Sequence, residues 1–265
     1  MVEHVGIDHF VSNRHGGFSQ GAYLSLNTAF HVGDKYDAVL HNRKKIARLL
    51  GVDLFQFTLA NQTHSNNIAV VGLSDKSCGS QGLDMAIADT DALLCNTKGV
   101  FICVQMADCV PILLYDPVKL VAGAVHAGWR STLKFIAPAA IEQMTKTFGC
   151  NSSDIIAGIG PSIGPCCYEV GEDVKLASNK VFGEKKGIIK PSANPGKYIF
   201  DQWQANYESL ILSGLKKKNI ELSEICTRCN SDKFFSSRAG NGLTGRFMAG
   251  RSEEHTSELQ SRHNL

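Results

Sequence analysis

Two consecutive apolar runs constrain the fold of this chain more than any other feature. Residues 111–116 ("PILLYD") and 120–127 ("LVAGAVHA") are mostly apolar, and the turn-like "DPVK" separates them. Short apolar runs bounded by turn residues are typical of strands that are buried on both faces. The pair therefore predicts two interior strands of a sheet that is covered on both sides.

Strand and helix patterns are interspersed along the rest of the chain. Further β-rich runs occur at 67–73 and 99–106, and a strand near residue 156 leads into a Gly/Pro loop. Apolar residues at helical spacing predict helices at 36–52, 131–149, 171–182 and 200–220. Pro138 predicts a kink or a late start in the second helix, and Asp201 is a candidate N-cap for the last. With no repeat and no linker, the chain is expected to form one α/β or α+β domain.

Composition and charge exclude several classes of protein. The chain has 265 residues, is 43% hydrophobic and carries a formal net charge of +2, so it lacks the basic surface typical of nucleic-acid binding. No apolar run approaches the roughly 18–20 residues of a membrane span. The N-terminal stretch lacks the basic and apolar segments of a secretory signal. We therefore expect a cytoplasmic protein with neither nucleic acid nor a membrane as partner. We also expect it to be a monomer or weak dimer.

Potential metal ligands lie at the ends of the β-rich runs. His64 follows "NQT", Cys109 precedes the first apolar run, and His126 lies near the end of the second. One thiolate and two imidazoles suit Zn²⁺ and also accept Cu²⁺, and three protein ligands leave a coordination position open, as in catalytic zinc sites. Taken singly, His64 or Cys109 is more often a packed core residue. The neighbouring Asp108 and Arg130 favour a site, because polar groups at buried strand ends need partners.

The nine cysteines show no pattern of a secreted disulfide scaffold, so most are expected to be buried free thiols. Cys226 and Cys229 form a C-x-x-C pair. We interpret it as a local disulfide or simple packing, because one pair cannot complete a four-cysteine zinc site and no second pair is evident. Cys167, next to Cys166, is interpreted as structural, with a place in the pocket lining as the alternative.

Several motifs occur together along the chain. They are "LSLNTAFHVGDKYDAVLHNR", "NQTHSNN", "DTDALLC", "MADCVPILLYDP", "VHAGWRS", "GIGPSIGPCCYEVG" and "FFSSRAGNGLTGR". In this order they resemble the YfiH/laccase-domain family, whose bacterial members are labelled polyphenol oxidase, multicopper-like laccase or purine nucleoside phosphorylase. The resemblance covers approximately residues 5–248. It implies an α+β fold, a layered α/β/β/α sandwich with mixed β-sheets in a single domain, and it implies His64, Cys109 and His126 as the metal ligands.

The resemblance also implies an activity on purine nucleosides. This comprises phosphorolysis of adenosine, inosine, guanosine and methylthioadenosine, with phosphate as co-substrate, and deamination of adenosine. Phosphorolysis needs cationic side chains around phosphate, and deamination needs the activated water that one Zn²⁺ with an open position supplies. The candidate catalytic residues are Asp108, Arg43 and Arg130. The candidate substrate-binding residues are Asn27, Gln62, Arg238 and Arg246.

The role of Asp108 and the reaction class have alternatives. Asp108 is expected to hold a proton or to orient a ligand histidine, and a structural hydrogen bond to a loop is the other interpretation. A copper-dependent polyphenol oxidase is the second hypothesis for the same site. A multicopper centre needs many histidines, however. The chain has nine, and two of them, His255 and His263, lie in its last fifteen residues, so only seven remain in the rest of the chain. A non-enzymatic metal-binding protein is the third hypothesis.

The end of the chain departs from the family pattern. Residues 251–265 are polar without periodicity, and we interpret them as a non-native tail, with the natural domain spanning residues 1–250. The final strand that normally follows "TGR" is accordingly expected to be missing. Ser131 also stands where the family usually has glycine after "HAGWR".

Overall fold

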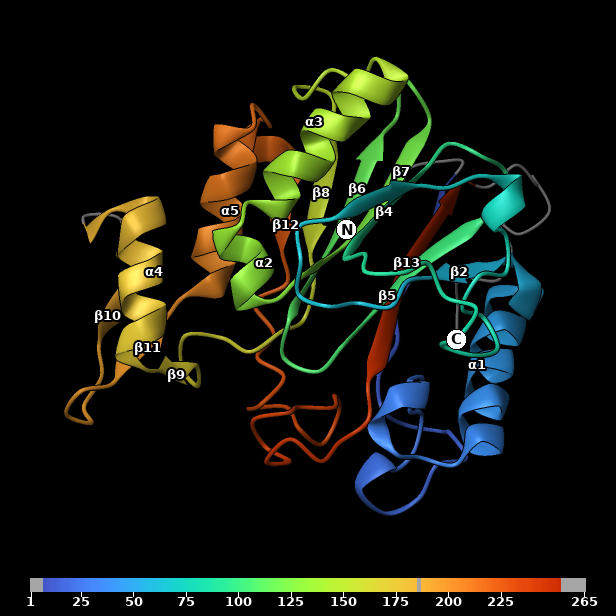
Figure 1. The fold of residues 1–265 in the computed structure, drawn as a ribbon, viewed down its shortest axis with the longest axis horizontal. Helices are drawn as coiled ribbons and strands as arrows, with labels where there is room; N and C mark the ends of the chain where they lie inside the picture. The colour runs from blue at the N-terminus through green and yellow to red at the C-terminus, as the bar shows by residue number, and fades with distance from the viewer. Residues whose placement is uncertain (1–6, 185–186, 254–265) are drawn as a thin grey trace.

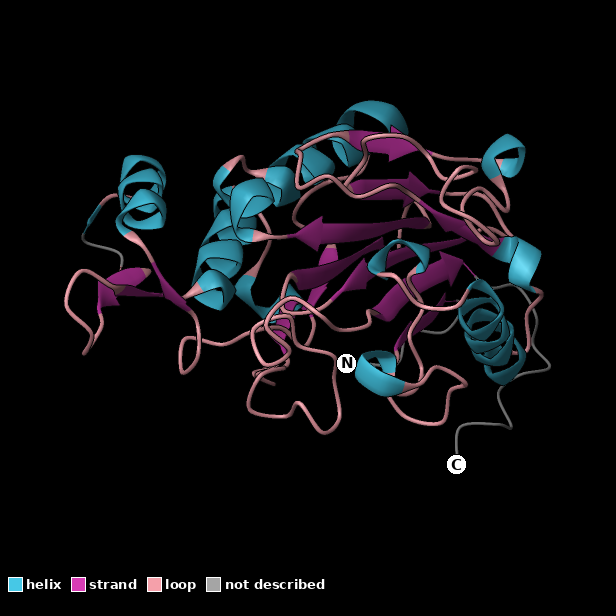
Figure 2. Ribbon diagram, turned by 60° about the horizontal axis from the view of Figure 1, so that its bottom comes forward, coloured by secondary structure: helices cyan, strands magenta, loops and turns pink. Residues whose placement is uncertain are grey.

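Two mixed β-sheets form the centre of the molecule, with the helices around them (Figure 2). The structure, a computed structural model, describes residues 7–184 and 187–253. The larger sheet has six strands in the order β12 (Ile220–Leu222), β8 (Ile156–Ile159), β6 (Val110–Asp116), β7 (Val121–Ala127), β4 (Ala92–Cys95) and β3 (Ile68–Val70). The smaller sheet has four, in the order β1 (Ile7–Val11), β13 (Phe247–Glu253), β5 (Phe101–Met106) and β2 (Phe57–Leu59). β6 is antiparallel to β7 and β8, whereas β12 is parallel to β8.

The alternation of side chains along each strand explains why the two sheets pack face to face. In β6, Ile112 and Leu114 belong to the apolar cluster under the helices, whereas Leu113 belongs to the cluster between the sheets. In β5, Ile102 lies between the sheets and Phe101 lies in the cluster on the other face. Because both faces are covered, β5, β6 and β7 are buried along their whole length, as the sequence predicted for the two consecutive runs that form β6 and β7.

Helices cover the outer face of each sheet (Figure 1). α3 (Ile136–Phe148) and α5 (Gln202–Leu212) pack on the six-stranded sheet, with the short α2 (Trp129–Leu133) beside them, and α1 (Tyr36–Leu50) packs on the four-stranded sheet. The layers therefore run helix, sheet, sheet, helix, which confirms the predicted single α+β domain with an α/β/β/α sandwich and mixed sheets. Within the described ranges, no helix is both long and apolar enough to cross a membrane.

A small third sheet projects from the sandwich, at the left of Figure 1. Its strands are β10 (Ile189–Pro191), β11 (Tyr198–Phe200) and β9 (Glu169–Val170) in that order, all antiparallel. α4 (Glu172–Phe182) packs on it around a separate apolar cluster. The sequence predicted this helix but not the three short strands, because two- and three-residue strands carry no alternating pattern of useful length.

The helix boundaries follow the local signals in the sequence. α3 starts anew at Ile136, so Pro138 lies in its first turn, where a missing backbone N–H has no consequence. Of the two interpretations of Pro138, the late start is the right one. Asp201 caps α5, since its side chain accepts a hydrogen bond from the backbone N–H of Gln204 at 3.0 Å. Gly51 ends α1 in the left-handed conformation, with φ 73°.

The last strand contradicts one expectation. β13 directly follows "TGR" and lies between β1 and β5, where it pairs with both. Arg251 is part of this strand and only 4% exposed, with its guanidinium over the ring of Tyr115. The expectation that the final strand is missing is therefore wrong, whereas the non-native origin of residues 251–265 stays a prediction. Pairing with β1 and β5 gives the backbone N–H and C=O groups of this polar segment their hydrogen-bond partners. Residues 254–265 lie outside the described residues.

Candidate active site and metal centre

Three side chains converge where the β6–β7 pair meets the loop after β2. Cys109 directly precedes β6, and His126 lies near the end of β7. Because the strands are antiparallel, with Pro111 opposite His126, the start of β6 and the end of β7 lie at the same end of the sheet. His64 comes from the loop between β2 and β3 and adopts a left-handed backbone conformation, with φ 61°. The topology thus brings together residues that are distant in sequence.

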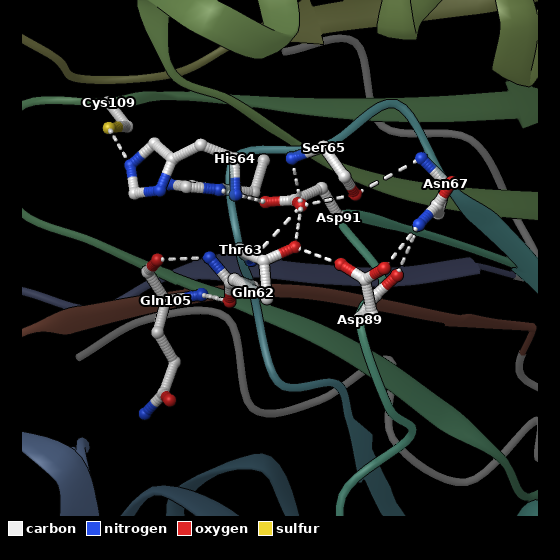
Figure 3. Close-up of polar contacts among 10 residues, drawn as sticks. Gln62, Thr63, His64, Ser65, Asn67, Asp89, Asp91, Gln105 and Cys109 are labelled. Carbon is white, nitrogen blue, oxygen red and sulfur yellow. Dashed lines mark hydrogen bonds and ion pairs between the residues drawn. The ribbon is translucent and has the colours of Figure 1, made fainter.

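The ligand atoms of the three residues are close enough to hold one ion. Cys109 Sγ lies 3.7 Å from His64 Nε2 (Figure 3). The sulfur and one nitrogen of each imidazole all lie within 4.8 Å of one another, and the two rings meet edge to face. Bonds of about 2.0–2.3 Å to a tetrahedral ion place ligand atoms roughly 3.3–3.8 Å apart. The residues present therefore fit a single zinc-type ion.

A carboxylate that the sequence did not single out organises these ligands. Asp91, directly before β4, accepts a hydrogen bond from Nδ1 of His126 at 2.8 Å, which leaves Nε2 as the ligand atom. It also accepts the backbone N–H of His64 at 3.1 Å, and both the backbone N–H and the hydroxyl of Ser65 (Figure 3). Asp91 thus orients one ligand and holds the loop that carries another. The available signal was an acid immediately before the apolar strand in "DTDALLC".

The charges within this cluster favour the thiolate, which is the form of cysteine that binds metals. Burial would raise the pKa of Cys109, but the charges and hydrogen bonds of His126 and His64 lower it well below its usual range. Burial would lower the pKa of His126, but the negative charge of Cys109 and the hydrogen bond to Asp91 raise it. Burial likewise opposes ionisation of Asp91, yet its bonds to His126 and Ser65 lower its pKa to about 2. Binding of a metal ion to Nε2 of His126 would displace the proton from that nitrogen.

Gly128 leaves room for the ligands at the start of α2. A Cβ atom at this position would lie 2.6 Å from Cδ2 of His64 and 3.1 Å from Cys109 Sγ. Both distances are shorter than ordinary van der Waals contacts between these atoms. The glycine of "HAGWR" is therefore required by the close approach of the two ligands rather than by its backbone conformation, since its φ is −68°.

The three ligands lie in the lining of a cavity of about 520 Å³, within the size range of small-molecule sites. Other predicted residues that line it are Asp108, Gln62, Arg238 and Arg246. Polar lining residues that the sequence did not single out are His31, Gln105, Tyr168, Ser237 and Asn241. The cavity therefore combines a metal-ligand set with several groups that can bind a polar substrate.

The Asp108 carboxylate is engaged by two neighbouring loops. One oxygen accepts the hydroxyl of Thr227 at 2.6 Å, and the other accepts the backbone N–H of Arg238 at 2.7 Å. Its backbone is left-handed, with φ 85°. These contacts correspond to the structural hydrogen bond that was the alternative interpretation of Asp108. The position beside a ligand histidine belongs to Asp91 instead.

Three lining residues are held in place by backbone groups. Gln62 donates to the carbonyl of Gln105 and accepts its N–H, both at 2.8 Å (Figure 3). Arg238 donates through Nη1 to the carbonyl of Glu169 at 2.9 Å. Arg246 donates through Nη1 to two carbonyls of its own loop, and burial lowers the pKa of its guanidinium. The two arginines thus bring anchored positive charge to the cavity.

Three other predicted residues do not reach the cavity lining. Arg43 is 2% exposed and donates to the carbonyl of Thr28 at 2.7 Å. Asn27 is buried and accepts the backbone N–H of Arg246 at 2.8 Å, so it fixes the loop of a lining residue. Arg130 is exposed and stacks over the neighbouring indole ring. Arg43 and Asn27 therefore support loops behind the cavity.

The fold and the site together define a single-domain α+β protein with a candidate Cys–His₂ metal site in the lining of a cavity. The chain belongs to the multi-copper polyphenol oxidoreductase laccase family, whose family model matches residues 8–251. The resemblance found in the motifs of the sequence is thereby confirmed.

Related proteins carry names from nucleoside metabolism. The chain is 37% identical to "Purine nucleoside phosphorylase YlmD" of Bacillus subtilis, over 90% of this chain and 85% of that protein. It is 35% identical to "Adenosine deaminase RL5" of an unknown prokaryotic organism, over 92% of this chain and 93% of that protein. The crystal structure of YlmD from Geobacillus stearothermophilus matches with a TM-score of 0.91 and 34% identity, over 95% of this chain and 93% of that chain.

Proposed function

We propose that this protein is a zinc-dependent purine nucleoside phosphorylase that also deaminates adenosine. One observation carries the proposal: the metal-ligand set and two anchored arginines line the same cavity. The names of the relatives, a purine nucleoside phosphorylase and an adenosine deaminase, support it. The proposed substrates are adenosine, inosine, guanosine and methylthioadenosine, with phosphate as the second substrate.

In phosphorolysis, Arg238 and Arg246 would bind the phosphate. An oxygen of phosphate bonds to C1′ of the ribose while the C1′–N9 bond breaks, and the base leaves with the bonding electrons and takes up a proton. The guanidinium fork matches phosphate oxygens, which makes Arg238 and Arg246 the groups that bind phosphate here. Their bonds to backbone carbonyls hold them in position before substrate enters, so little reorganisation is needed during reaction.

His64, Cys109 and His126 are the residues that would hold Zn²⁺. When bound, the ion would supply Lewis-acid chemistry, such as the activation of water that deamination at purine C6 requires. Asp91 holds Nδ1 of His126, so that Nε2 remains available as a ligand. The lowered pKa of Cys109 keeps the thiol in its ligating form.

Three of the remaining predicted residues act by positioning in this proposal. Asp108 joins the loop of Thr227 to that of Arg238, and Arg238 lines the cavity. Asn27 and Arg43 hold neighbouring loops from behind. Arg130 is exposed and stacks over Trp129 outside the cavity lining, so the proposal gives it no contact with substrate.

Product analysis with and without phosphate tests the proposal. Zinc-loaded protein and adenosine should give adenine and ribose 1-phosphate only when phosphate is present, and inosine and ammonia without it. Cys109→Ala should abolish both reactions, because one ion serves both. Cys78→Ala removes a thiol outside the site and should keep both activities. Full activity of Cys109→Ala would contradict the role of the ion.

A copper-dependent polyphenol oxidase is the second candidate, favoured by the description of the family model. Within residues 7–184 and 187–253, the clusters able to hold a metal are the Cys–His₂ site and a group of four cysteines. Neither offers the several histidines of a multicopper centre. Phenol oxidation that appears only after copper loading would support this candidate. Bound metal with neither activity would support a non-enzymatic metal-binding protein.

A further inference from the structure

Four cysteines gather at a place separate from the Cys–His₂ site. Cys166 and Cys167 lie in the turn after β8, and Cys226 and Cys229 lie in the turn after β12. Their sulfur atoms all lie within 4.8 Å of one another. Sγ of Cys229 is 3.6 Å from that of Cys166 and 3.4 Å from that of Cys167. All four are free thiols. The adjacent cysteines thus supply the second pair that the sequence did not reveal.

The topology of the larger sheet explains why these turns meet. β8 and β12 are parallel neighbours, with Ile159 opposite Leu222, so both strands leave the sheet at the same edge. The pairing continues beyond the strands as a parallel bridge between Ser162 and Cys226. Ser162 donates its N–H to the carbonyl of Ile225 and accepts the N–H of Thr227. The two cysteine pairs are therefore held together by backbone bonds, whether or not an ion is bound.

We propose that these four thiols form a second metal site, which binds Zn²⁺ through four thiolates and has a structural role. Four sulfurs at Zn–S bonds of about 2.3 Å lie roughly 3.8 Å apart in a tetrahedron. Cys229 Sγ lies slightly closer than this to two of the others, at 3.4 and 3.6 Å, and all four sulfurs lie within 4.8 Å of one another. Four protein ligands leave no open position, which is the pattern of structural zinc sites. Thiolate ligands favour soft or borderline ions over Mg²⁺ or Ca²⁺. Cys166 and Cys229 are exposed, so an ion can enter from solvent.

Donor groups around the sulfurs support the thiolate form. The backbone N–H of Gly164 points to Cys226 Sγ at 3.3 Å, and Nη1 of Arg228 points to Cys167 Sγ at 3.4 Å. A divalent ion with four thiolates carries a net negative charge, and the guanidinium of Arg228 offsets part of it. Hydrogen bonds to ligand sulfurs are the usual outer contacts of such sites.

The second site would position the wall of the catalytic cavity. Thr227 lies between the two cysteines of the C-x-x-C pair and donates to Asp108. Arg238, a lining residue, donates to the carbonyl of Cys167 at 3.4 Å. An ion on the four sulfurs would cross-link the two turns that make these contacts. Its effect on catalysis would therefore be through the placement of Asp108 and Arg238.

Zinc stoichiometry tests the second site independently of activity. Full-length protein purified without chelators should contain one more zinc ion per chain than the Cys166→Ser/Cys229→Ser variant. These two exposed thiols are chosen because their replacement disturbs packing least. The matched control Cys78→Ser should keep the wild-type zinc content. Equal zinc content in the double variant and the control would overturn the proposal.

Cobalt spectroscopy provides a measurement that does not depend on folding of the double variant. Cys109→Ala, stripped of metal and titrated with Co²⁺, should develop the intense sulfur-to-cobalt absorption and visible bands of a tetrahedral four-thiolate site. Absence of these bands would overturn the proposal. So would a disulfide between the two turns, detected by peptide mass spectrometry, in protein purified without oxidants.

Discussion

Asp91 binds Nδ1 of His126 at 2.8 Å, and the same carboxylate accepts the backbone N–H of His64. The contact is possible because β4 and β7 are antiparallel neighbours, with Ala92 opposite Val125. One acid at the start of a strand therefore positions two of the three candidate metal ligands. Its ionised form is favoured, since its pKa is lowered to about 2 in spite of burial.

Replacing this acid should weaken metal binding without removing a ligand. Asp91→Asn keeps the size of the side chain but loses its charge. It therefore no longer holds the proton of His126 on Nδ1, which is what leaves Nε2 free to bind metal. We expect the zinc affinity to fall about 10–100-fold, the usual effect of losing such a partner. Competition with a chromophoric chelator measures it. Asp89→Asn is the control, because Asp89 contacts Thr63 and Asn67 rather than a ligand side chain (Figure 3). Equal affinities in the two variants would contradict this role.

Gly128 provides a steric test of the ligand geometry. The added methyl group of Gly128→Ala would lie 2.6 Å from the ring of His64 and 3.1 Å from the Cys109 sulfur, so the ligands must separate. The variant should lose most of its zinc while retaining its secondary structure by circular dichroism. In the control Gly72→Ala, the new methyl would lie 3.8 Å from Thr97 Oγ1, an ordinary contact. A Gly128→Ala protein with the wild-type zinc content would show that the ligands are not arranged as described.

Arg246 should act mainly on phosphate. A hydrogen bond to a charged group contributes about 1.5–3 kcal/mol, so Arg246→Gln should raise KM for phosphate by about 10–100-fold. KM for the nucleoside should change little. Initial rates at varied phosphate and fixed nucleoside, and the reverse, separate the two effects. Arg48→Gln removes an exposed arginine of α1 as the control. A change confined to nucleoside binding would assign Arg246 to the base or ribose instead.

The central strands and the candidate ligands Cys109 and His126 could be anticipated from sequence because each carries a local signal. The β6 and β7 segments are apolar on both faces, which only a doubly covered sheet requires. Cys109 and His126 are polar residues at the ends of such strands, where they need partners. The capping of α5 by Asp201 is equally local. In each case the residues within one element determine the outcome.

The remaining features depend on which strands become neighbours. Asp91 lies 35 residues before His126, and only the β4–β7 pairing brings them together. The four cysteines meet only because β8 and β12 are parallel neighbours. Arg251 lies in a segment that looks like polar tail, yet β13 is a central strand because β1 and β5 pair with it. No short-range pattern contains this information.

His31 offers a test of the electrostatics of the cavity. Burial and then the positive charges of Arg246 and Arg43 lower the pKa of His31 below its ordinary value of 6.5. Removing one charge in Arg246→Gln should raise this pKa, whereas the control Arg48→Gln should leave it unchanged. Histidine resonances followed by NMR against pH measure the change, and His31→Gln identifies the signal. Because the unfolded chain binds this proton more readily, the wild-type free energy of unfolding should fall more steeply below pH 6.5 than that of His31→Gln. An unchanged pKa in Arg246→Gln would show that the charge of Arg246 does not act on His31.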